Sequence, residues 1–390
     1  MRTHALVLSL AIAAAAGAAA SPATAAPAPG WEHPGFDAED SHYNPAESVI
    51  NAGSVERLVK KWSMPLRDAP ESCSGWSPPL VSGGRVIVND KLGISAYDAG
   101  SGAVRWHFDW DQPDDNTTPI LGVGGGLLIA ANGDCNSQSD PDGQLVALDL
   151  ADGKVRWKLS VDAPVRSAVV DRGVVVISGW SPSDEEVVAG FRASDGKPLW
   201  DKPGWSTSGV SANGVILMRK TDGSGAADGG SSAIDVRDGS LRWSRLENWV
   251  VEAAFDGSFY VTDERGSLIA VDETDGSVLW RAKGKASALI AVDGQRVYRS
   301  SGRVVEALDG RNGRRVWKTP MGVEAGQPVR AGGLLYAGGP VLTASRGETA
   351  GAAFNSQVLV TDSALYQVEK ETLVAYEPKF DRWRGAELWR

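Results

Sequence analysis

The stretch that decides the fold is "ALDLADGKVRW", residues 147–157, which places an apolar run, an aspartate, an Asp-Gly turn and a tryptophan in a fixed order. Variants of this phrase end at Trp106, Trp157, Trp200, Trp243, Trp280 and Trp317. Consecutive copies are 51, 43, 43, 37 and 37 residues apart. A repeat of about 40 residues built from short strands and turns is typical of one four-stranded propeller blade. The phrase therefore predicts an all-β propeller.

A second periodic signal gives the number of blades. Between the tryptophans, apolar runs flank short turns of the kind that β-hairpins need. These turns lie at Gly83-Gly84, Gly124 to Gly126, Arg172-Gly173, Asn213-Gly214, Asp256-Gly257, Asp293-Gly294, Gly332-Gly333 and Asp362-Ser363. Two further stretches, "VLTASRG" with Ala344 and "LVAYEPK" with Ala375, resemble degenerate copies of the phrase. We predict eight four-stranded antiparallel blades, or seven if the segment around Ala344 is only an insertion.

The phrase itself is interpreted as structural. Each blade has strands A to D, with the Asp-Gly pair in the C-D turn and the tryptophan in strand D. The stretch "LVKKWSMP" around Trp62 resembles a strand D without its own A, B and C. We expect it to pair with the strand around Ala375 and close the ring, which removes free sheet edges. Large aromatic rings between neighbouring sheets bury area and seat their N–H on a partner. This structural role is predicted for Trp62, Trp106, Trp157, Trp200, Trp243, Trp280 and Trp317.

The N-terminus has the features of an export signal. Arg2 is followed by an Ala/Leu-rich run and then by the small-x-small site Ala23-Thr24-Ala25. We expect a signal peptide over residues 1–26, a lead-in segment over 27–57 and one propeller domain over 58–390, secreted or otherwise extracytoplasmic. No cysteine precedes Cys73, so no thiol near the cleavage site could carry a lipid. No membrane span is expected after cleavage.

Charge and composition exclude some functions. The net charge of −10 argues against a nucleic-acid surface, which needs a basic stripe. The four histidines show no ligand spacing, so no metal site is predicted. Strand order places the D-A and B-C loops together on one rim, where the enlarged loops lie. Cys73 and Cys135 reach this rim from neighbouring blades, and a disulfide between them is predicted for an exported protein.

Aromatic and acidic residues outside the repeated phrase gather in the same loops. Trp rings interleaved with carboxylates suit a sugar, a cationic ligand or a basic segment of a partner. The alternative is that the rings merely cover blade ends. The predicted ligand-binding residues are Trp76, Asp109, Trp110, Asp111, Asp134, Trp180, Trp205 and Trp249.

The ring of these phrases resembles the pyrroloquinoline-quinone-type propeller repeat. Quinoprotein alcohol dehydrogenases share this repeat with an eight-bladed lipoprotein of outer-membrane protein assembly. Residues 35–62 are similar to the dehydrogenase lead-in, where a short Asn-x-x-x-Val-x-x-Leu helix precedes a strand with a Trp. The resemblance to the dehydrogenases implies three features of those enzymes: an adjacent Cys-Cys pair, a calcium-bound quinone and a catalytic aspartate. Here the two cysteines are far apart in sequence, and the stretch "FDWDQPDDN" offers Asp109, Trp110 and Asp111 as only a faint resemblance to the sequence around that aspartate.

We therefore expect an exported, non-enzymatic binding or scaffold propeller without a cofactor. Its loop-rich rim would recognise a protein, peptide or glycan at the cell surface. The alternative is a reduced quinoprotein alcohol or sugar dehydrogenase that uses pyrroloquinoline quinone and calcium, with Asp111 or a neighbouring carboxylate as the catalytic residue.

Overall fold

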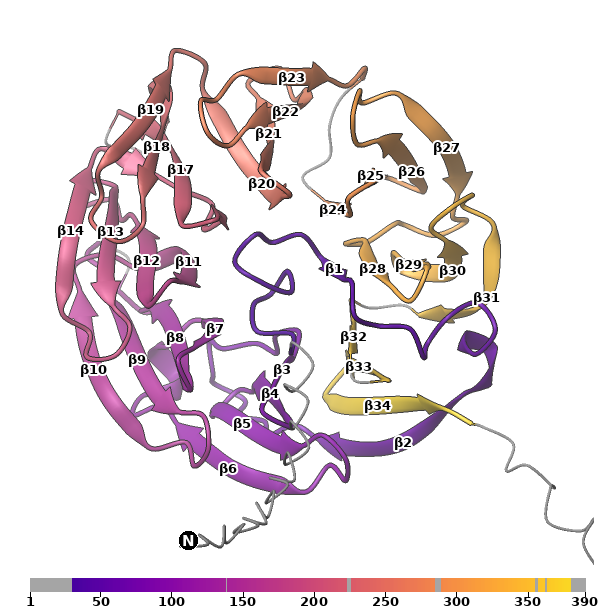
Figure 1. Ribbon diagram of the computed structural model, residues 1–390. Helices are drawn as coiled ribbons and strands as arrows, with labels where there is room; N and C mark the ends of the chain where they lie inside the picture. The colour runs from indigo at the N-terminus through magenta and orange to yellow at the C-terminus, as the bar shows by residue number, and fades with distance from the viewer. Residues whose placement is uncertain are drawn as a thin grey trace, which may run out of the picture.

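The computed structural model describes residues 30–137, 139–222, 226–284, 289–354, 357–361 and 363–379. These residues form eight sheets arranged in a ring around a central axis (Figure 1), and all strand pairs are antiparallel except β1 (Tyr43–Asn44), which pairs in parallel with β28 (Val329–Ala331). The predicted eight-bladed propeller is confirmed. The segment around Ala344 belongs to a complete blade, so the seven-bladed alternative is wrong. The expected signal peptide, residues 1–26, lies outside the described residues.

Each blade contains four strands that follow one another across the sheet. Blade 1 contains β3 (Leu80–Ser82), β4 (Arg85–Asn89), β5 (Gly93–Asp98) and β6 (Val104–Asp109), and blade 2 contains β7 (Ile120–Gly124), β8 (Leu127–Gly133), β9 (Gly143–Asp149) and β10 (Val155–Val161). Blade 3 contains β11 (Val165–Asp171), β12 (Val174–Gly179), β13 (Val187–Arg192) and β14 (Pro198–Pro203). In blade 4 the innermost strand is divided into β15 (Trp205–Ser206) and β16 (Ser211–Ala212), and β17 (Val215–Thr221), β18 (Ala227–Asp235) and β19 (Leu241–Arg245) follow. The strands of blades 5 to 7 are β20 (Trp249–Phe255), β21 (Ser258–Asp263), β22 (Leu268–Asp272), β23 (Val278–Arg281); β24 (Ile290–Val292), β25 (Arg296–Ser301), β26 (Val304–Asp309), β27 (Arg315–Pro320); and β28 (Val329–Ala331), β29 (Leu334–Tyr336), β30 (Gly339–Thr343), β31 (Thr349–Phe354).

Blade 8 joins the two ends of the described chain. Its strands A to C are β32 (Val358–Thr361), β33 (Ala364–Glu369) and β34 (Thr372–Pro378), and its strand D is the N-terminal β2 (Leu58–Pro65). Trp62 of β2 lies opposite Ala375 of β34, and Figure 1 shows β2 beside β34. The expected ring closure by the strand around Trp62 is therefore confirmed. A short 3-10 helix, η1 (Val55–Arg57), leads into β2, and a second one, η2 (Pro113–Asp115), follows blade 1.

The repeated phrase forms the contacts between successive blades. In strand D each indole lies opposite a small residue of strand C, as Trp157 lies opposite Ala147. The indole N–H then donates to a backbone carbonyl of the next blade. The pairs are Trp62 with Ala99, Trp106 with Leu150, Trp157 with Ala193, Trp200 with Val236, Trp243 with Glu273, Trp280 with Gly310 and Trp317 with Ala344, at 2.7–3.2 Å.

The glycine of each C-D turn lies directly beneath the indole of the preceding blade. A methyl group at Gly153 would approach the Trp106 ring to 2.7 Å, and the Gly153 φ of 72° is itself unfavourable for other residues. Glycine is therefore required here by both the turn and the packing. The repeated phrase therefore forms the contact between neighbouring blades, and we call this contact of indole, carbonyl and turn glycine the seam. No catalytic role follows from it.

An N-terminal segment fills the axis of the ring. We call residues 30–44 the plug; in Figure 1 it runs inside the ring and ends at β1 (Tyr43–Asn44). Backbone N–H groups of six innermost strands donate to plug carbonyls, one or two residues before each A-B turn. The donors are Val81, Val123, Ser211, Ala254, Val292 and Arg330. Asn44 Nδ2 donates to the Val360 carbonyl of blade 8, and His33 interacts with the Val170 backbone of blade 3. The plug thus contacts all eight blades.

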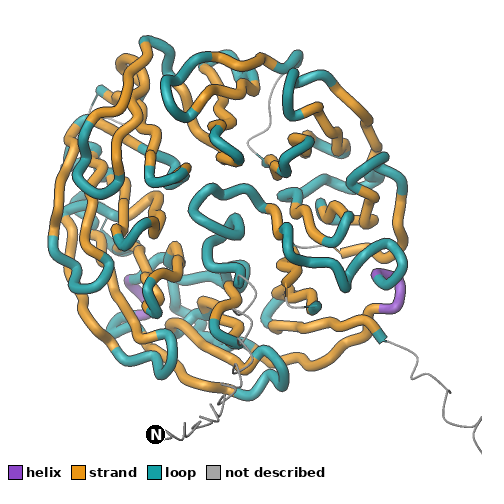
Figure 2. The backbone as a smooth tube through the Cα atoms, in the orientation of Figure 1, coloured by secondary structure: helices purple, strands orange, loops and turns teal. Residues whose placement is uncertain are grey.

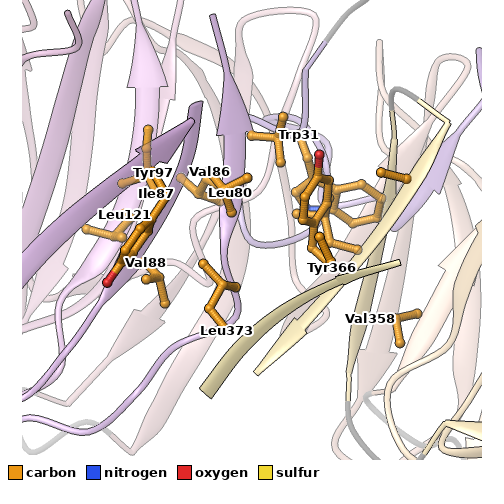
Figure 3. Close-up of a cluster of buried hydrophobic side chains, with 14 of the residues drawn as sticks. Trp31, Leu80, Val86, Ile87, Val88, Tyr97, Leu121, Val358, Tyr366 and Leu373 are labelled. Atoms are coloured by element: carbon orange, nitrogen blue, oxygen red, sulfur yellow. The ribbon is translucent and has the colours of Figure 1, made fainter. Parts of the chain in front are cut away.

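The largest apolar cluster lies where the ring closes. It joins buried side chains of blades 7, 8, 1 and 2 to Trp31 of the plug, which is 1 % exposed. Figure 3 shows Trp31 and Tyr366 on one side of this cluster and the side chains of β4 and β5 on the other. Outside the strands, the described chain is almost entirely loops and turns (Figure 2). Loops therefore provide most of the surface at both rims.

Candidate functional site

Two rims of the ring differ in the size of their loops. The A-B and C-D turns form one rim, and we call the opposite rim, with the B-C and D-A loops, the loop-rich rim. Most A-B turns have two residues, as between β11 and β12, where Arg172 and Gly173 both have positive φ. Residues 134–142 between β8 and β9, by contrast, form a long B-C loop. Binding residues are concentrated on loops of this kind.

A disulfide ties two loops of the loop-rich rim together. Cys73, in the D-A loop before blade 1, is bonded to Cys135, in the B-C loop of blade 2, with a Cα–Cα distance of 6.5 Å. The predicted disulfide is confirmed. Asp115 of η2 accepts hydrogen bonds from the backbone N–H groups of Cys135 and Asn136, at 3.1 and 2.7 Å. Three loops of this rim are thereby held in one arrangement.

A polar cavity opens between blades 3, 4 and 5 on the loop-rich rim. We call it the rim pocket; it has a volume of about 420 Å³. Its lining is Arg166, Ser167, Ser178, Glu186, Ser206, Thr207, Ser208, Leu217, Arg219, Trp249, Val250 and Val251. Hydroxyl groups outnumber apolar side chains in this set, and both signs of charge are present. Such a lining suits a polar ligand group rather than a purely apolar one.

Hydrogen bonds within the pocket fix several of its walls. Arg219 Nε donates to Ser206 Oγ at 3.0 Å. The guanidinium of Arg166 lies over the Trp180 ring, 5.2 Å from its centroid, and its Nε donates to the Trp180 carbonyl. Side chains with partners of this kind are already ordered, so a ligand would not have to order them on binding.

Two buried atoms in the rim pocket have no hydrogen-bond partner among the described residues. They are the Trp249 Nε1–H, on a side chain 2 % exposed, and Glu186 Oε2, on a side chain 8 % exposed. Burial raises the pKa of Glu186, whereas the nearby Thr221 hydroxyl, the positive charge of Arg219, the Ser206 hydroxyl and the positive charge of Arg166 act in the opposite direction. A buried polar group without a partner costs free energy, and a ligand that satisfies it recovers that cost. The walls of the pocket therefore hold one unsatisfied donor and one unsatisfied acceptor, both buried beneath its surface, and a ligand reaches them only when these side chains shift.

The structure brings only some of the predicted site residues together. Trp249 lines the rim pocket, and Trp180 contacts its wall through Arg166. Trp205 lies in β15, partly buried against a core cluster formed by blades 3 and 4. These three tryptophans belong to one sector of the loop-rich rim.

The other predicted residues lie around blades 1 and 2. Trp110 is 4 % exposed and packs edge-on against Phe108, whereas Trp76 is partly exposed beneath the Lys91 ammonium, 4.9 Å from the ring centroid. The other members of this group are Asp109, which is ion-paired with Arg67; Asp111, which pairs with Lys158; and Asp134, which accepts a hydrogen bond from the Asp142 N–H. This group does not converge on a cavity with the tryptophans of the rim pocket.

Sequence reasoning missed the charged residues of the rim pocket. Glu186 lies just before β13, at the end of the B-C loop that follows β12, and Arg219 lies within β17. In β17 four apolar residues are followed by Arg219, Lys220 and Thr221, so the strand pattern does not distinguish Arg219 from its charged neighbour Lys220. No local signal marks Glu186 as buried.

The plug carries carboxylates at the end of the central axis that faces away from the loop-rich rim. Burial raises the pKa of Asp37 to about 6 and that of Glu39 to about 7. Asp171 and Glu273 on the surrounding blades add negative charge near Glu39 and raise its pKa further. Burial lowers the pKa of His33 to about 4, so this histidine is neutral at physiological pH. The end of the axis at the rim formed by the A-B and C-D turns is thus an acidic, largely buried environment.

The residues implied by the quinoprotein resemblance do not form a cofactor site. Asp111 has a side chain 85 % exposed and an ion pair with Lys158 at 2.9 Å. Cys73 and Cys135 are 62 residues apart and join two loops, so they provide no ring of adjacent cysteines. Among the described residues, no group of three or more His, Cys, Asp or Glu side chains is arranged to hold a metal ion. The donor set therefore does not fit calcium-bound quinone at Asp111.

The seams, the eight blades and the closing strand define a β-propeller built from quinoprotein-type repeats. A family model described as "Outer membrane protein assembly factor BamB" matches residues 90–248 and 232–360. The chain belongs to this family of PQQ-like repeat propellers.

Individual relatives agree with this assignment. Outer membrane protein assembly factor BamB of Burkholderia pseudomallei is 29 % identical over 231 residues, which are 55 % of this chain and 58 % of the relative's length. The crystal structure of BamB from Moraxella catarrhalis has a TM-score of 0.59 at 18 % identity, covering 83 % of this chain and 99 % of that one. Quinohemoprotein alcohol dehydrogenase from Comamonas testosteroni has a TM-score of 0.66 at 14 % identity, covering 94 % of this chain and 83 % of that one. At these identities the structural likeness shows the fold alone.

Within the described residues, no helix has the length and hydrophobicity that a membrane span needs.

Proposed function

We propose that this protein is an exported, non-enzymatic scaffold that binds a partner protein through its loop-rich rim. The rim pocket is the anchor point of this interaction, and no cofactor takes part. The observation that carries the proposal is the pair of buried, unpartnered atoms in the pocket, Trp249 Nε1 and Glu186 Oε2.

The chemistry of the pocket favours a polypeptide. A peptide group, or the amide of an Asn or Gln side chain, offers one N–H to Glu186 and one carbonyl oxygen to Trp249. Arg166 stands at the exposed edge of the pocket, stacked on Trp180, where it can reach a carboxylate or carbonyl of the partner. Arginine and tryptophan are the residues on which binding energy is most often concentrated in protein interfaces.

Family membership supports the same proposal. The relatives that match the chain over more than half of its length bear the name outer membrane protein assembly factor. Assembly factors act on other proteins, and we therefore propose a protein partner ahead of the glycan that the rim tryptophans could also suit. From the export signal expected over residues 1–26, we propose that this partner lies outside the cytoplasm.

Site-specific photo-crosslinking in the cells that produce the protein tests the proposal. A p-benzoylphenylalanine residue in place of Ser208, in the rim pocket, is expected to give a discrete adduct with a second protein. The same residue in place of Ser240, in an exposed C-D turn of the opposite rim, serves as the matched control and is expected to give none. Adducts from Ser240 alone, or from neither position, would contradict the proposed rim.

A titration of the purified protein tests the non-enzymatic part. Pyrroloquinoline quinone and calcium are added while tryptophan fluorescence and dye-linked oxidation of alcohols and sugars are followed. We expect neither saturable quenching nor turnover. Saturable quenching with turnover would establish a dehydrogenase instead.

A further inference from the structure

One seam of the ring lacks the contact that defines the other seven. The seam tryptophan stands four residues after the glycine of the C-D turn, as Trp317 follows Gly313. In blade 7 the corresponding turn glycine is Gly347, and the residue four positions later is Gly351. A Cβ at Gly351 would lie 2.2 Å from Glu56 Cγ, so η1 already approaches the backbone closely at this point.

The missing tryptophan has a topological cause. In every other seam the indole rests on the C-D turn of the next blade. Blade 8 has no such turn, because its strand C is β34, near the C-terminus, and its strand D is β2, near the N-terminus. A tryptophan at position 351 would therefore have no turn glycine to rest on.

A groove of about 620 Å³ remains at this seam. Its residues come from η1, from the start of β2, from the end of β31, from β33 and from β34: Val55, Glu56, Leu58, Ala352, Ala353, Phe354, Gln367, Val368, Glu369, Lys370 and Tyr376. Phe354 and Tyr376 form an edge-on aromatic pair with centroids 6.1 Å apart, and the Tyr376 hydroxyl donates to Glu369 at 2.6 Å. The groove thus offers aromatic and apolar surface beside two carboxylates, those of Glu56 and Glu369, and one ammonium group, that of Lys370.

The chain continues from the edge of this groove. The Lys379 N–H donates to the Arg57 carbonyl at 2.9 Å, and Arg57 lies between the groove residues Glu56 and Leu58. The residues that follow, 380–390, read "FDRWRGAELWR" and lie outside the described residues. Four residues span at most roughly 14 Å when extended, so Trp383 can reach the groove from Lys379.

We propose that the C-terminal segment 380–390 docks in this groove and inserts the indole of Trp383 between blades 7 and 8. Trp383 is flanked by Arg382 and Arg384, whose positive charges complement Glu56 and Glu369. Because the segment is tethered next to the groove, its effective concentration there is on the order of millimolar. The C-terminus thereby supplies the tryptophan that blade 7 lacks.

Fluorine NMR of the full chain labelled with 5-fluorotryptophan tests this docking directly. Trp383→Ala and Trp389→Ala assign the two resonances, and a soluble paramagnetic agent reports their exposure. We expect the relaxation enhancement of Trp383 to be at least several-fold smaller than that of Trp389. Equal enhancement of the two resonances would overturn the proposal and leave the groove open to a partner's side chain.

Hydrogen exchange on the same variants reports the effect on the seam. Trp383→Ala is expected to speed amide exchange in β31 and β34 by about tenfold, whereas the matched control Trp389→Ala leaves it unchanged. Identical exchange in the two variants and the parent would overturn the proposal. Protection that disappears on dilution would show that a second copy supplies the segment, which also contradicts docking within one chain.

Discussion

The indole of Trp106 in blade 1 lies on Gly153 in the C-D turn of blade 2, and its N–H donates to the Leu150 carbonyl three residues earlier, at 3.1 Å. This relationship, repeated from blade to blade, explains why the phrase recurs with the same Asp-Gly and Trp. Glycine is required in these turns for two different reasons. Some turns need only a residue that accepts positive φ, whereas the C-D turns also need the absence of a side chain beneath the indole ring.

Gly153→Ala should destabilise the protein more than the same substitution at a glycine that is needed only for the positive φ of its turn. The new methyl group meets both the φ of 72° and the Trp106 ring, so we expect a loss of about 2–4 kcal/mol in the free energy of unfolding. Gly173→Ala is the control, because Gly173 has a φ of 78° but no atom within 4 Å of the added Cβ. It should lose only about 1–2 kcal/mol. Equal losses in denaturant titrations would show that the ring contact is unimportant.

Breaking the disulfide should destabilise the early blades. Cys73 and Cys135 enclose a loop of 62 residues, for which loop-closure entropy gives about 4 kcal/mol. Cys73→Ser, Cys135→Ser and the reduced parent should therefore show the same loss in thermal unfolding. A reductant should have no further effect on either variant. Unchanged melting of all three would contradict a structural role for the bond.

The buried carboxylate of Glu39 should make stability depend on pH. Its pKa is about 7 in the folded protein against an ordinary 4.5, so the folded state holds a proton that the unfolded state releases between these values. Stability from this group is present below pH 4.5 and is lost as pH rises towards 7. Glu39→Gln should therefore gain about 1–2 kcal/mol over the parent above pH 7, after allowance for partial exposure, and nothing near pH 4.5.

Denaturant titrations at several pH values measure this difference. The exposed Glu264→Gln is the control and should run parallel to the parent across the range. A gain for Glu39→Gln that does not change with pH would show that the effect is one of packing alone.

Ring closure by β2 should be essential for folding. Removing residues 27–66 takes away strand D of blade 8 and the plug together, which exposes the edge of β34. Circular dichroism and size-exclusion chromatography should then show an unfolded or aggregated chain. Removing only residues 30–42 keeps β2 and should leave a folded ring of lower stability. A stable, monomeric product of the longer deletion would contradict the closure.

The fold was largely predictable because its signals are local and repeated. Short A-B turns such as Arg172-Gly173 recur in every blade, the tryptophans recur at a regular spacing in all blades but blade 7, and Trp62 identified the closing strand. The plug was not predictable, because six strands hold it through backbone N–H groups and its side chains follow no strand pattern. The candidate site was only partly predictable. The loop-rich rim follows from strand order, but the burial of Glu186 depends on three blades coming together.

The proposed function depends most directly on the affinity of the partner captured by crosslinking at Ser208. Isothermal titration calorimetry should compare the parent protein with Arg166→Ala, at the edge of the rim pocket, and with Arg237→Ala, an exposed arginine in a C-D turn of the opposite rim. We expect Kd to rise at least about tenfold for Arg166→Ala, as truncation of an interface arginine commonly causes, and to stay unchanged for Arg237→Ala. Unchanged binding by Arg166→Ala, or an equal loss in both variants, would contradict the account.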